Sequence, residues 1–571
     1  MSIKKLLTAL VLTVSLAAPI GAAENTKWVD AFLRRYQPVS ASESGATSEI
    51  GEMLQTGAMS IAMSDLINMM LDKNLDLQSN RFSPRSSYYS SLVFYRALQP
   101  SIRFSGNMNK NSSANNSQLN GTATVSRQTR VNTTTSFTQA LPTGTSVAVD
   151  FQMNRVYSNS NLNTFNPSFA GVLTYTVGQK LLRDRGRLPN TRQIMTSQNN
   201  QKISEITFEI QLTTLLVSAQ KSYWDLVFAG EDLKVKQRSL ELAQRTLEEN
   251  QMKVEIGTLA PIDVIQTRSD VATRRDAMVT STFSVTTAED QIKKLVSADR
   301  DPSMFLLRFS PKEQPRRADT ITMPTLEEAV RVALENRPEV RSSALDLKNR
   351  EIDEKYTKNQ TLPQLDMTLT YNQNGTGGTQ FVRSTLGGGA STTIPGGIGK
   401  AFDQLFSYNY SGYSVGFVFN MPLSSKAQKA DHERSITDRQ LSEARMKATA
   451  QSIMLEVRNA LTSVEQSRAR IETAQTSLEL AKLRLDAEQT KFSLGTSTLR
   501  FVLEEQRNVA QAETTELQTR VNLTKALIDL DKATGMTLRN NNVEVNKALQ
   551  QSSMTDYKVI VAPSLVQQQQ Q

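Results

Sequence analysis

The residue types that catalyse reactions or bind metals are scarce in this chain of 571 residues. It contains no cysteine and a single histidine, His432, which stands in the polar run Lys429-Ala-Asp-His-Glu-Arg434. The lack of cysteine excludes disulfides, thiolate metal sites and a lipid anchor on an N-terminal cysteine. We expect His432 on a solvated helix surface. No spacing typical of a nucleophile with its base or of a metal site occurs, and Gly387-Gly-Gly389 precedes no helix, so no phosphate-binding loop is predicted. We expect no enzyme activity and no cofactor.

One stretch of the chain occurs twice. Its matched positions are a Ser-Leu-Glu-Leu-Ala run at 239 and 477, a lysine at 253 and 491, and a Gly-Thr pair at 257 and 495, a constant offset of 238 residues. Each copy has a helical pattern on both sides of its glycine. Each copy therefore predicts a long helical hairpin with the glycine in its turn. We expect the function to come from what the two hairpins build together.

The N-terminus has the three-part order of a secretory signal peptide. Two lysines at 4 and 5 precede an apolar run from 6 to 18 and small residues from 21 to 23, and we expect cleavage after Ala23 and export of the mature chain. No later run reaches the roughly 18 apolar residues of a spanning helix, so membrane insertion would need strands. The net charge is +9, but acidic and basic residues are mixed and no basic cluster is interleaved with aromatics, so nucleic acid is not an expected partner.

Beyond Pro100 and Pro363 the apolar period changes from helical to two. Four segments with one apolar and one polar face lie at 102–104, 173–177, 365–371 and 415–421. They fit strands that cross a bilayer around a wet lumen, although a half-buried sheet of a soluble protein alternates in the same way. Residues 121–154 predict an added hairpin in the first strand pair, whose entry into the bilayer is left open. The Gly- and Ser-rich stretch 372–412 predicts a long exposed loop.

The helical segments have complementary lengths. Residues 189–257 and 428–495 predict helices of about 100 Å, and the return segments 261–298 and 499–535 predict about 57 Å each at 1.5 Å per residue. Shorter helical patterns at 60–98 and 326–362 add roughly 55 Å each. One continuous helix can therefore lie against two half-length helices stacked end to end.

These patterns divide the chain into ten segments. They are a signal peptide (1–23), an N-terminal segment (24–58), a helix of the first repeat (59–99), strands 1 and 2 with the added hairpin (100–182), the first long hairpin (183–299), an equatorial linker (300–324), a helix of the second repeat (325–362), strands 3 and 4 with the long loop (363–423), the second long hairpin (424–538) and a polar C-terminal tail (539–571).

Several local motifs accompany the duplicated hairpins. They are Leu326-x2-Ala-x3-Ala-Leu-x3-Pro-Glu-Val340, the strand-to-helix transitions Thr176–Leu182 and Ser414–Leu423, and the aromatic helix motif Tyr223-Trp-Asp-Leu226. Together with the signal peptide and the proline-bounded strands, they resemble the TolC family of outer-membrane efflux proteins over about residues 60 to 538.

The resemblance implies an α+β membrane protein with long antiparallel helical hairpins and four transmembrane strands per subunit. Three subunits would share one 12-stranded β-barrel in the lipid of the outer membrane, with a helical tunnel in the periplasm. The implied function is the outer-membrane channel of a tripartite efflux or type I secretion system, a passive duct opened at its periplasmic tip. The implied partners are two further copies of the chain, a periplasmic adaptor (membrane fusion) protein, and an inner-membrane pump or ABC transporter.

The resemblance also implies site residues. The adaptor would contact the hairpin tips at Gly257, Thr258, Gly495 and Thr496.

The family's gate lies just past these glycines, and Asp263 matches a position that often carries aspartate. Phe501 and Glu504 stand where the best-known member has two aspartates, and Ser497 stands where it has a gating arginine. The implied gate of Asp263, Phe501 and Glu504 is therefore partly hydrophobic and partly acidic. As alternatives, Phe501 packs between helices, and Asp263 caps a helix that begins near Pro261.

The alternative to a membrane duct is a protein of a different class. In a periplasmic or surface coiled-coil scaffold or adhesin, the same strands would form a small soluble sheet. A membrane duct requires four amphipathic strands of bilayer length, two per copy, which this sequence supplies.

Overall fold

The computed structural model describes residues 58–114, 125–160, 163–296, 307–315, 323–384, 390–545 and 548. The predicted signal peptide (1–23), most of the N-terminal segment (24–58), the glycines at 387–389 and most of the C-terminal tail (539–571) lie outside these residues. All described elements belong to one compact unit, Leu54–Ser553. Among them, no helix combines the length and the apolar character that a membrane span requires.

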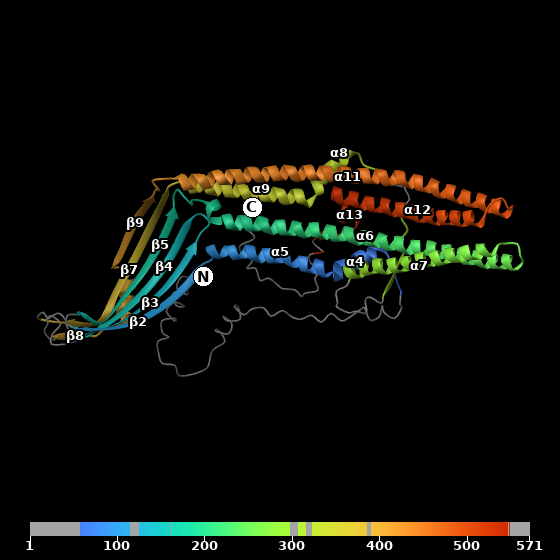
Figure 1. The fold of residues 1–571 in the computed structure, drawn as a ribbon. Coiled ribbons are helices and arrows are strands. Elements are labelled where there is room, and N and C mark those ends of the chain that lie inside the picture. The colour runs from blue at the N-terminus through green and yellow to red at the C-terminus, as the bar shows by residue number, and fades with distance from the viewer. Residues whose placement is uncertain are drawn as a thin grey trace, which may run out of the picture. The chain divides into compact units, whose positions relative to one another are not determined.

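Two long antiparallel helical hairpins form the main body of this unit (Figure 1). The first consists of α6 (Arg187–Glu255) and α7 (Pro261–Val296), and the second of α11 (Lys426–Ser493) and α12 (Leu499–Thr534). The long helices have 69 and 68 residues and each return helix has 36. The predicted pair of helical hairpins is confirmed, because both glycine-containing turns fall between the expected helices.

The shorter helices of each repeat are broken where a single helix was predicted. The first comprises α4 (Met63–Lys73) and α5 (Leu75–Val93), followed by the 3-10 helix η2 (Phe94–Leu98). The second comprises α8 (Leu326–Asn336) and α9 (Pro338–Gln360). The breaks are at Asn74 and Arg337, equivalent positions of the repeats, and both residues are extended, with ψ of 120° and 125°. Arg337 precedes a proline, which disfavours the helical conformation.

The two break residues also hold the ends of the return helices. Asn74 Nδ2 donates to the Leu295 carbonyl at 2.8 Å, near the end of α7. Arg337 Nη1 donates to the Lys532 and Ala533 carbonyls at 3.1 and 3.4 Å, near the end of α12. Helix α6 packs against α5 and then α7 on one side, and against α9 and α12 on the other. The predicted end-to-end arrangement of half-length helices is therefore present.

The apolar core follows the helix contacts. In the second repeat it includes Ala333, Val457, Leu523 and Ala533, from α8, α11 and α12. In the first repeat, the fully buried Tyr223 of α6 donates its hydroxyl to the Ile61 carbonyl at 3.3 Å. Ile61 belongs to β1 (Ala58–Ile61), which pairs in parallel with β6 (Arg308–Pro311), a strand within the predicted linker 300–324.

One antiparallel sheet carries the other strands. Its long strands are β2 (Ser101–Ala114), β3 (Val125–Ala140), β4 (Thr145–Ser158), β5 (Phe165–Lys180), β7 (Gln364–Val382) and β9 (Ser411–Asn420), and the short β8 (Thr392–Ile394) pairs with the end of β7. The order is β2-β3-β4-β5-β7, with β9 on the free side of β7.

The sheet has six long strands, four at the predicted membrane strands and two from the predicted added hairpin. All four predicted strands are present, but the added hairpin contributes β3 and β4, which lie between β2 and β5 in the same sheet. The β3–β4 hairpin pairs on both of its sides along nearly its whole length. It therefore widens the sheet and is not an appendage. The long strands other than β9 have 14 to 19 residues, because the pairing continues through Thr- and Asn-rich stretches that lack an apolar signal.

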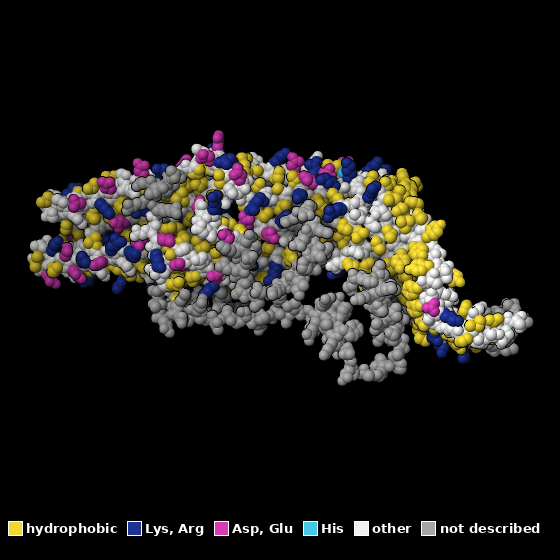
Figure 2. All heavy atoms as spheres, turned by 180° about the vertical axis from the view of Figure 1, so that it is seen from behind, with side chains coloured by type: hydrophobic (Ala, Val, Ile, Leu, Met, Phe, Trp, Pro, Cys, Tyr) yellow, Lys and Arg dark blue, Asp and Glu magenta, His cyan; other side chains and the backbone are white. Residues whose placement is uncertain are grey.

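One face of the sheet is apolar. The register aligns Ile102, Phe137, Val149, Tyr175, Tyr371 and Tyr413 in one row across all six long strands. Residues an odd number of positions away along a strand, such as Arg103, Thr176 and Asp366, point to the other face. The space-filling view shows hydrophobic side chains gathered over the sheet (Figure 2).

The stretch predicted as a long exposed loop contains a helix. Helix α10 (Ile398–Phe406) buries Ala401 and Leu405 against the apolar face, where Leu405 joins Phe151, Met153 and Leu173. At two positions of β7 beneath it, Gly375 and Gly377, a Cβ atom would come within 2.1 and 2.4 Å of the helix backbone or its cap. Glycine at these two positions lets the helix lie close to the sheet.

Candidate functional site

The two hairpin tips have the same turn geometry. Gly257 and Gly495 have φ of +77° and +74°, in the left-handed region that favours glycine. In the first turn the Gly257 amide donates to the Val254 carbonyl at 3.0 Å, and the Thr258 amide donates to the Lys253 carbonyl at 2.9 Å. The second turn makes the corresponding bonds at 3.1 and 2.9 Å. Each long helix thus ends in a Schellman motif, and the duplicated sequence folds in a duplicated way.

The tip residues face solvent. Gly257, Thr258, Gly495 and Thr496 are all exposed. A Cβ atom built on either glycine would meet no atom within 4 Å. The two tips are linked by Lys253, whose ammonium lies 5.7 Å from the ring centroid of Phe492.

The second tip contains a hydrogen-bonded carboxylate, Glu488, which the first tip lacks. We call Glu488 with Ser497 and Lys491 the polar lock. The Ser497 hydroxyl donates to one carboxylate oxygen of Glu488, and Lys491 Nζ lies 3.2 Å from the other. These hydrogen bonds, the one from Ser497 above all, lower the pKa of Glu488. The equivalent of Glu488 in the first hairpin is Asn250, whose amide donates to the Thr267 hydroxyl at 3.2 Å. Only the second tip therefore has a titratable lock.

We expect the second tip to lose local stability in acid. A carboxyl group with a lowered pKa in the folded state stabilises that state above its unfolded pKa, about 4.3 for glutamate, and the stabilisation is lost as the pH falls through the folded value. Amide hydrogen exchange of residues 488–497, corrected for intrinsic rates, should accelerate as the pH falls below the unfolded pKa of glutamate, about 4.3. The Glu488→Gln variant and the first tip should lack this response, and the same pH profile in both tips would contradict the assignment.

A buried ionic cluster joins the two return helices behind the tips. Arg274 Nε and Asp270 Oδ2 are 2.7 Å apart, and the side chains are only 5% and 6% exposed. Arg274 also donates to Gln506 Oε1 of α12 at 3.2 Å and to the Ser239 carbonyl at 3.1 Å. Arg507 of α12 lies 3.5 Å from the other Asp270 oxygen. Burial lowers the pKa of Arg274, and the Asp270 carboxylate acts in the opposite direction.

One segment of the chain matches a known protein family. Residues 329–536 match the family model of the outer membrane efflux protein. This stretch of the chain therefore resembles outer membrane efflux proteins. The match lies within the second repeat, α8 to the end of α12, and the first repeat carries the same hairpin motif and the same turn geometry. The expectation of a channel and not an enzyme is confirmed by this match, because the family consists of outer membrane efflux channels. No match was found among curated protein sequences.

Solved outer-membrane channels share the fold of this chain. The CmeC channel of Campylobacter jejuni is 15% identical, with 95% of this chain and 98% of that chain covered and a TM-score of 0.57. VceC of Vibrio cholerae is 12% identical, with coverage of 83% and 96% and a TM-score of 0.56. MtrE of Neisseria gonorrhoeae is 16% identical, with coverage of 83% and 89% and a TM-score of 0.53. The predicted combination of long helical hairpins and antiparallel strands is thereby confirmed.

The predicted gate residues lie in the first turns of the return helices. Asp263 and Phe501 are each the third residue of their helix, α7 and α12. Asp263 is half-buried, Glu504 is exposed, and the Phe501 side chain is 53% exposed. Asp263 lies inside α7, so it is not the residue that caps it. Phe501 does not pack between helices of one chain. Within the described residues no hydrogen bond or ion pair joins Asp263 to Glu504.

Sequence reasoning missed two features of this region. In the sequence Ser497 is recognisable only as the replacement of a gating arginine, whereas in the structure its hydroxyl donates to Glu488 across the turn. The second feature is the pair of Asp270 and Arg274, whose spacing of four residues suits an ion pair on one helix face. Such a spacing does not reveal burial, which α6 and α12 impose.

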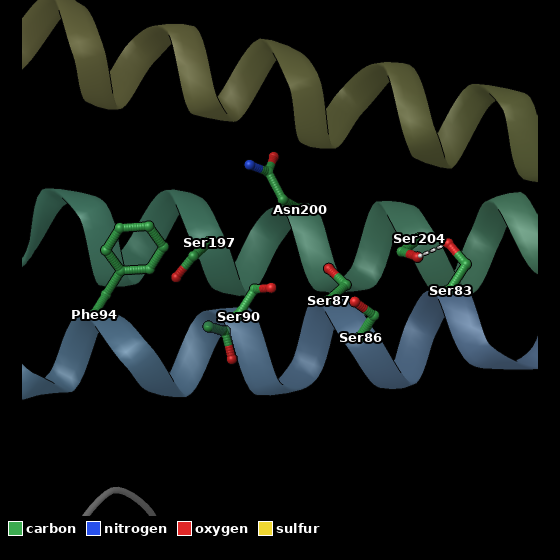
Figure 3. Close-up of a pocket in the computed structure, with 9 residues that line it drawn as sticks. Ser83, Ser86, Ser87, Ser90, Phe94, Ser197, Asn200 and Ser204 are labelled. Carbon is green, nitrogen blue, oxygen red and sulfur yellow. Dashed lines mark hydrogen bonds between the residues drawn. The ribbon is translucent and has the colours of Figure 1, made fainter.

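Two other candidate sites do not support chemistry. His432 lies on α11, with its Nδ1 3.3 Å from the Thr357 hydroxyl of α9, and no group of acidic, histidine or cysteine side chains in the described residues could hold a metal ion. A hollow of about 480 Å³ between α5 and α6 is lined mostly by serines (Figure 3). Ser83 and Ser204 share a hydrogen bond of 3.3 Å there, but no titratable side chain lines the hollow.

Proposed function

We propose that this efflux protein is the passive exit duct of a tripartite efflux or type I secretion system. Three copies form a ring whose strands cross the outer membrane as one barrel and whose helices continue as a tunnel in the periplasm. An inner-membrane pump or ABC transporter drives the substrate through this tunnel. A periplasmic adaptor docks on the exposed tips Gly257-Thr258 and Gly495-Thr496, and the chain itself supplies no energy.

The unpaired edges of the sheet carry the proposal of a ring. Among the described strands, β2 pairs only with β3, and at the other end β9 pairs only with β7. Unpaired backbone groups cost several kcal/mol each in lipid, so membrane-spanning sheets are closed. Pairing of β2 in one copy with β9 in the next removes both edges, and such a head-to-tail contact closes into a ring.

The helices support the proposed contact between the β2 edge of one copy and the β9 edge of the next. Helix α5 leads into β2 and packs mainly against α6, and α11 follows β9 and packs mainly against α9, α12 and α8. The outer sides of α5 and α11 therefore stand on the same two edges as β2 and β9. Exposed apolar side chains are present on both edges, including Phe82 of α5 and Leu483 of α11, at 49% and 58%.

The six long strands change the expected barrel. Three copies supply eighteen long strands and not the twelve implied by four strands per chain. Because barrel diameter grows roughly linearly with strand number, the membrane part of this duct is wider than that of a twelve-stranded channel. The apolar face, with its row from Ile102 to Tyr413, faces lipid, and the polar face lines the lumen.

The gate is proposed at Asp263, Phe501 and Glu504. These residues stand one to two turns nearer the tip than Asp270 and Arg507, where α7 and α12 are tied together. Three exposed Phe501 rings around the axis would narrow the pore by steric block and dewetting, and the carboxylates would favour cations.

Replacing Phe501 or Glu504 by alanine is expected to raise single-channel conductance in planar bilayers several-fold, because each change removes bulk from the constriction. Phe283→Ala is the matched control, since Phe283 is 68% exposed but lies far from the tip, in the second half of α7. It should leave conductance unchanged. Unaltered conductance in both tip variants would contradict the gate.

The mass of the native particle tests the duct itself. Detergent extraction of outer membranes should yield a particle of three mature chains that resists mild detergent and migrates differently after heating. A soluble monomer or dimer would contradict the duct and favour the periplasmic or surface coiled-coil scaffold or adhesin.

A further inference from the structure

The apolar face of the sheet ends in basic side chains. Moving away from the helices along the matched strands, the row of Ile102 and Phe137 is followed by rows that contain Arg155, then Lys110, and then Arg127. All three share the face of Ile102, because an even number of residues separates each from an apolar-face residue of its own strand. Dark blue side chains appear toward this end of the sheet in the space-filling view (Figure 2).

Helix α10 adds a fourth cation at the same level. Its backbone lies over Gly375 and Gly377, and Gly377 pairs with Phe169, the partner of Arg155 in the neighbouring strand pair. Ala401 and Leu405 of α10 face the sheet and are fully buried, whereas Lys400 is exposed. The helix is amphipathic and lies flat, which is the arrangement of a helix at a membrane interface.

These cations have no carboxylate partner. Lys110, Arg127, Arg155 and Lys400 form no ion pair with any residue in the described ranges, although Arg155 lies 6.0 Å from the ring centroid of Phe169. From Ile102 to Lys180 and from Leu365 to Asn420 the sequence contains only three acidic residues. Asp150 and Asp366 are on the polar face, which leaves Asp403 of α10 as the one acidic residue near the four cations.

A ligand for this surface needs two parts. The apolar rows require hydrocarbon, and the cations directly beyond them require an anion at its end. Arginine is suited to phosphate, because its planar guanidinium can make two parallel hydrogen bonds. We propose that Lys110, Arg127, Arg155 and Lys400 form a band that binds the phosphate groups of anionic lipids in the membrane leaflet farthest from the helices. This rests on the proposed function, since it requires the apolar face to stand in a bilayer.

The test compares two arginine pairs with the same charge change. Arg127→Gln with Arg155→Gln removes two cations of the band. Arg103→Gln with Arg130→Gln removes two cations from the polar face of β2 and β3 and serves as the control. Each purified protein is inserted into vesicles of phosphatidylcholine with about one third phosphatidylglycerol, and the lipids that remain bound after mild extraction are counted by native mass spectrometry.

We expect the unmodified protein to retain phosphatidylglycerol several-fold over its share of the vesicle, the band variant to lose this enrichment, and the polar-face variant to keep it. Equal loss in both variants would overturn the proposal, because net charge and not the band would then decide binding. Insertion without enrichment in the unmodified protein would overturn it as well, but would leave the duct standing. Failure to insert into vesicles of phosphatidylcholine alone would overturn the duct and the lipid band together.

Discussion

Replacing Gly495 with tryptophan is expected to abolish export while the oligomer still forms, and the same change at Gly257 should act alike. Neither glycine has an atom within 4 Å of its Cβ position, so an indole ring would extend outward and cover the tip that the adaptor is proposed to contact. Export can be measured as dye efflux from cells that also contain the pump and adaptor. Heat-modifiable migration reports the oligomer.

Two further variants separate bulk from backbone strain at the tip. Gly495→Ala forces a residue with a Cβ atom into the left-handed region at a cost of roughly 1–2 kcal/mol, yet adds only a methyl group, so export should persist. Thr496→Trp adds bulk without that strain and should abolish export. Normal export in Gly495→Trp, or equal loss in Gly495→Ala, would contradict adaptor docking at the tip.

Asp270→Ala is expected to lower the free energy of unfolding by about 3–5 kcal/mol, the range for removal of one partner of a buried ion pair. The loss follows because Arg274 would remain only 5% exposed without its carboxylate. Arg274→Ala should cost less, since the exposed Arg507 stays near Asp270. Urea unfolding of the purified protein, monitored by helix content, would measure both changes.

Two controls define the origin of this loss. Arg245→Ala removes an exposed pair of the same spacing, with side chains 69% and 60% exposed, and should change stability by about 0–1 kcal/mol. Asp270→Leu with Arg274→Met replaces both charges by apolar groups and should be far milder than Asp270→Ala, because no buried charge is left unpaired. A double variant as unstable as Asp270→Ala would contradict the electrostatic explanation.

The helix breaks at Asn74 and Arg337, where short and return helices meet, show how far local sequence predicts backbone conformation. The residue before Pro338 is restricted by the proline, so a break at Arg337 follows from local sterics. Asn74 has no proline after it, and its extended conformation is held by bonds to Leu77 within the chain segment and to Leu295 far away. Equivalent positions of the two repeats thus reach one geometry by different local means, and only the packed return helices make the equivalence visible.

For the strands too, local sequence predicts one part of the structure and long-range pairing decides the rest. Alternation of apolar and polar residues was sufficient to locate the four predicted strands, because a sheet with one apolar face requires a period of two. It was not sufficient to place the hairpin of β3 and β4, since the pairing partner of a strand depends on residues distant in sequence. Helix α10 has a helical apolar period at Ile398, Ala401, Phe402 and Leu405, but its place on the sheet depends on Gly375 and Gly377 of a distant strand. The polar ends of the strands carry no comparable periodic signal.

For the site, the two hairpins and their turns follow from the amino-acid sequence alone. A duplicated Gly-Thr pair between helical patterns needs a left-handed glycine wherever it occurs, and that requirement is local. Tertiary structure alone decided that Ser497 locks Glu488, that Asp270 and Arg274 are buried, and that Phe501 is exposed. These outcomes depend on which helix lies beside each side chain, and burial of a charge or a ring is a property of its neighbours, not of its own position in the sequence.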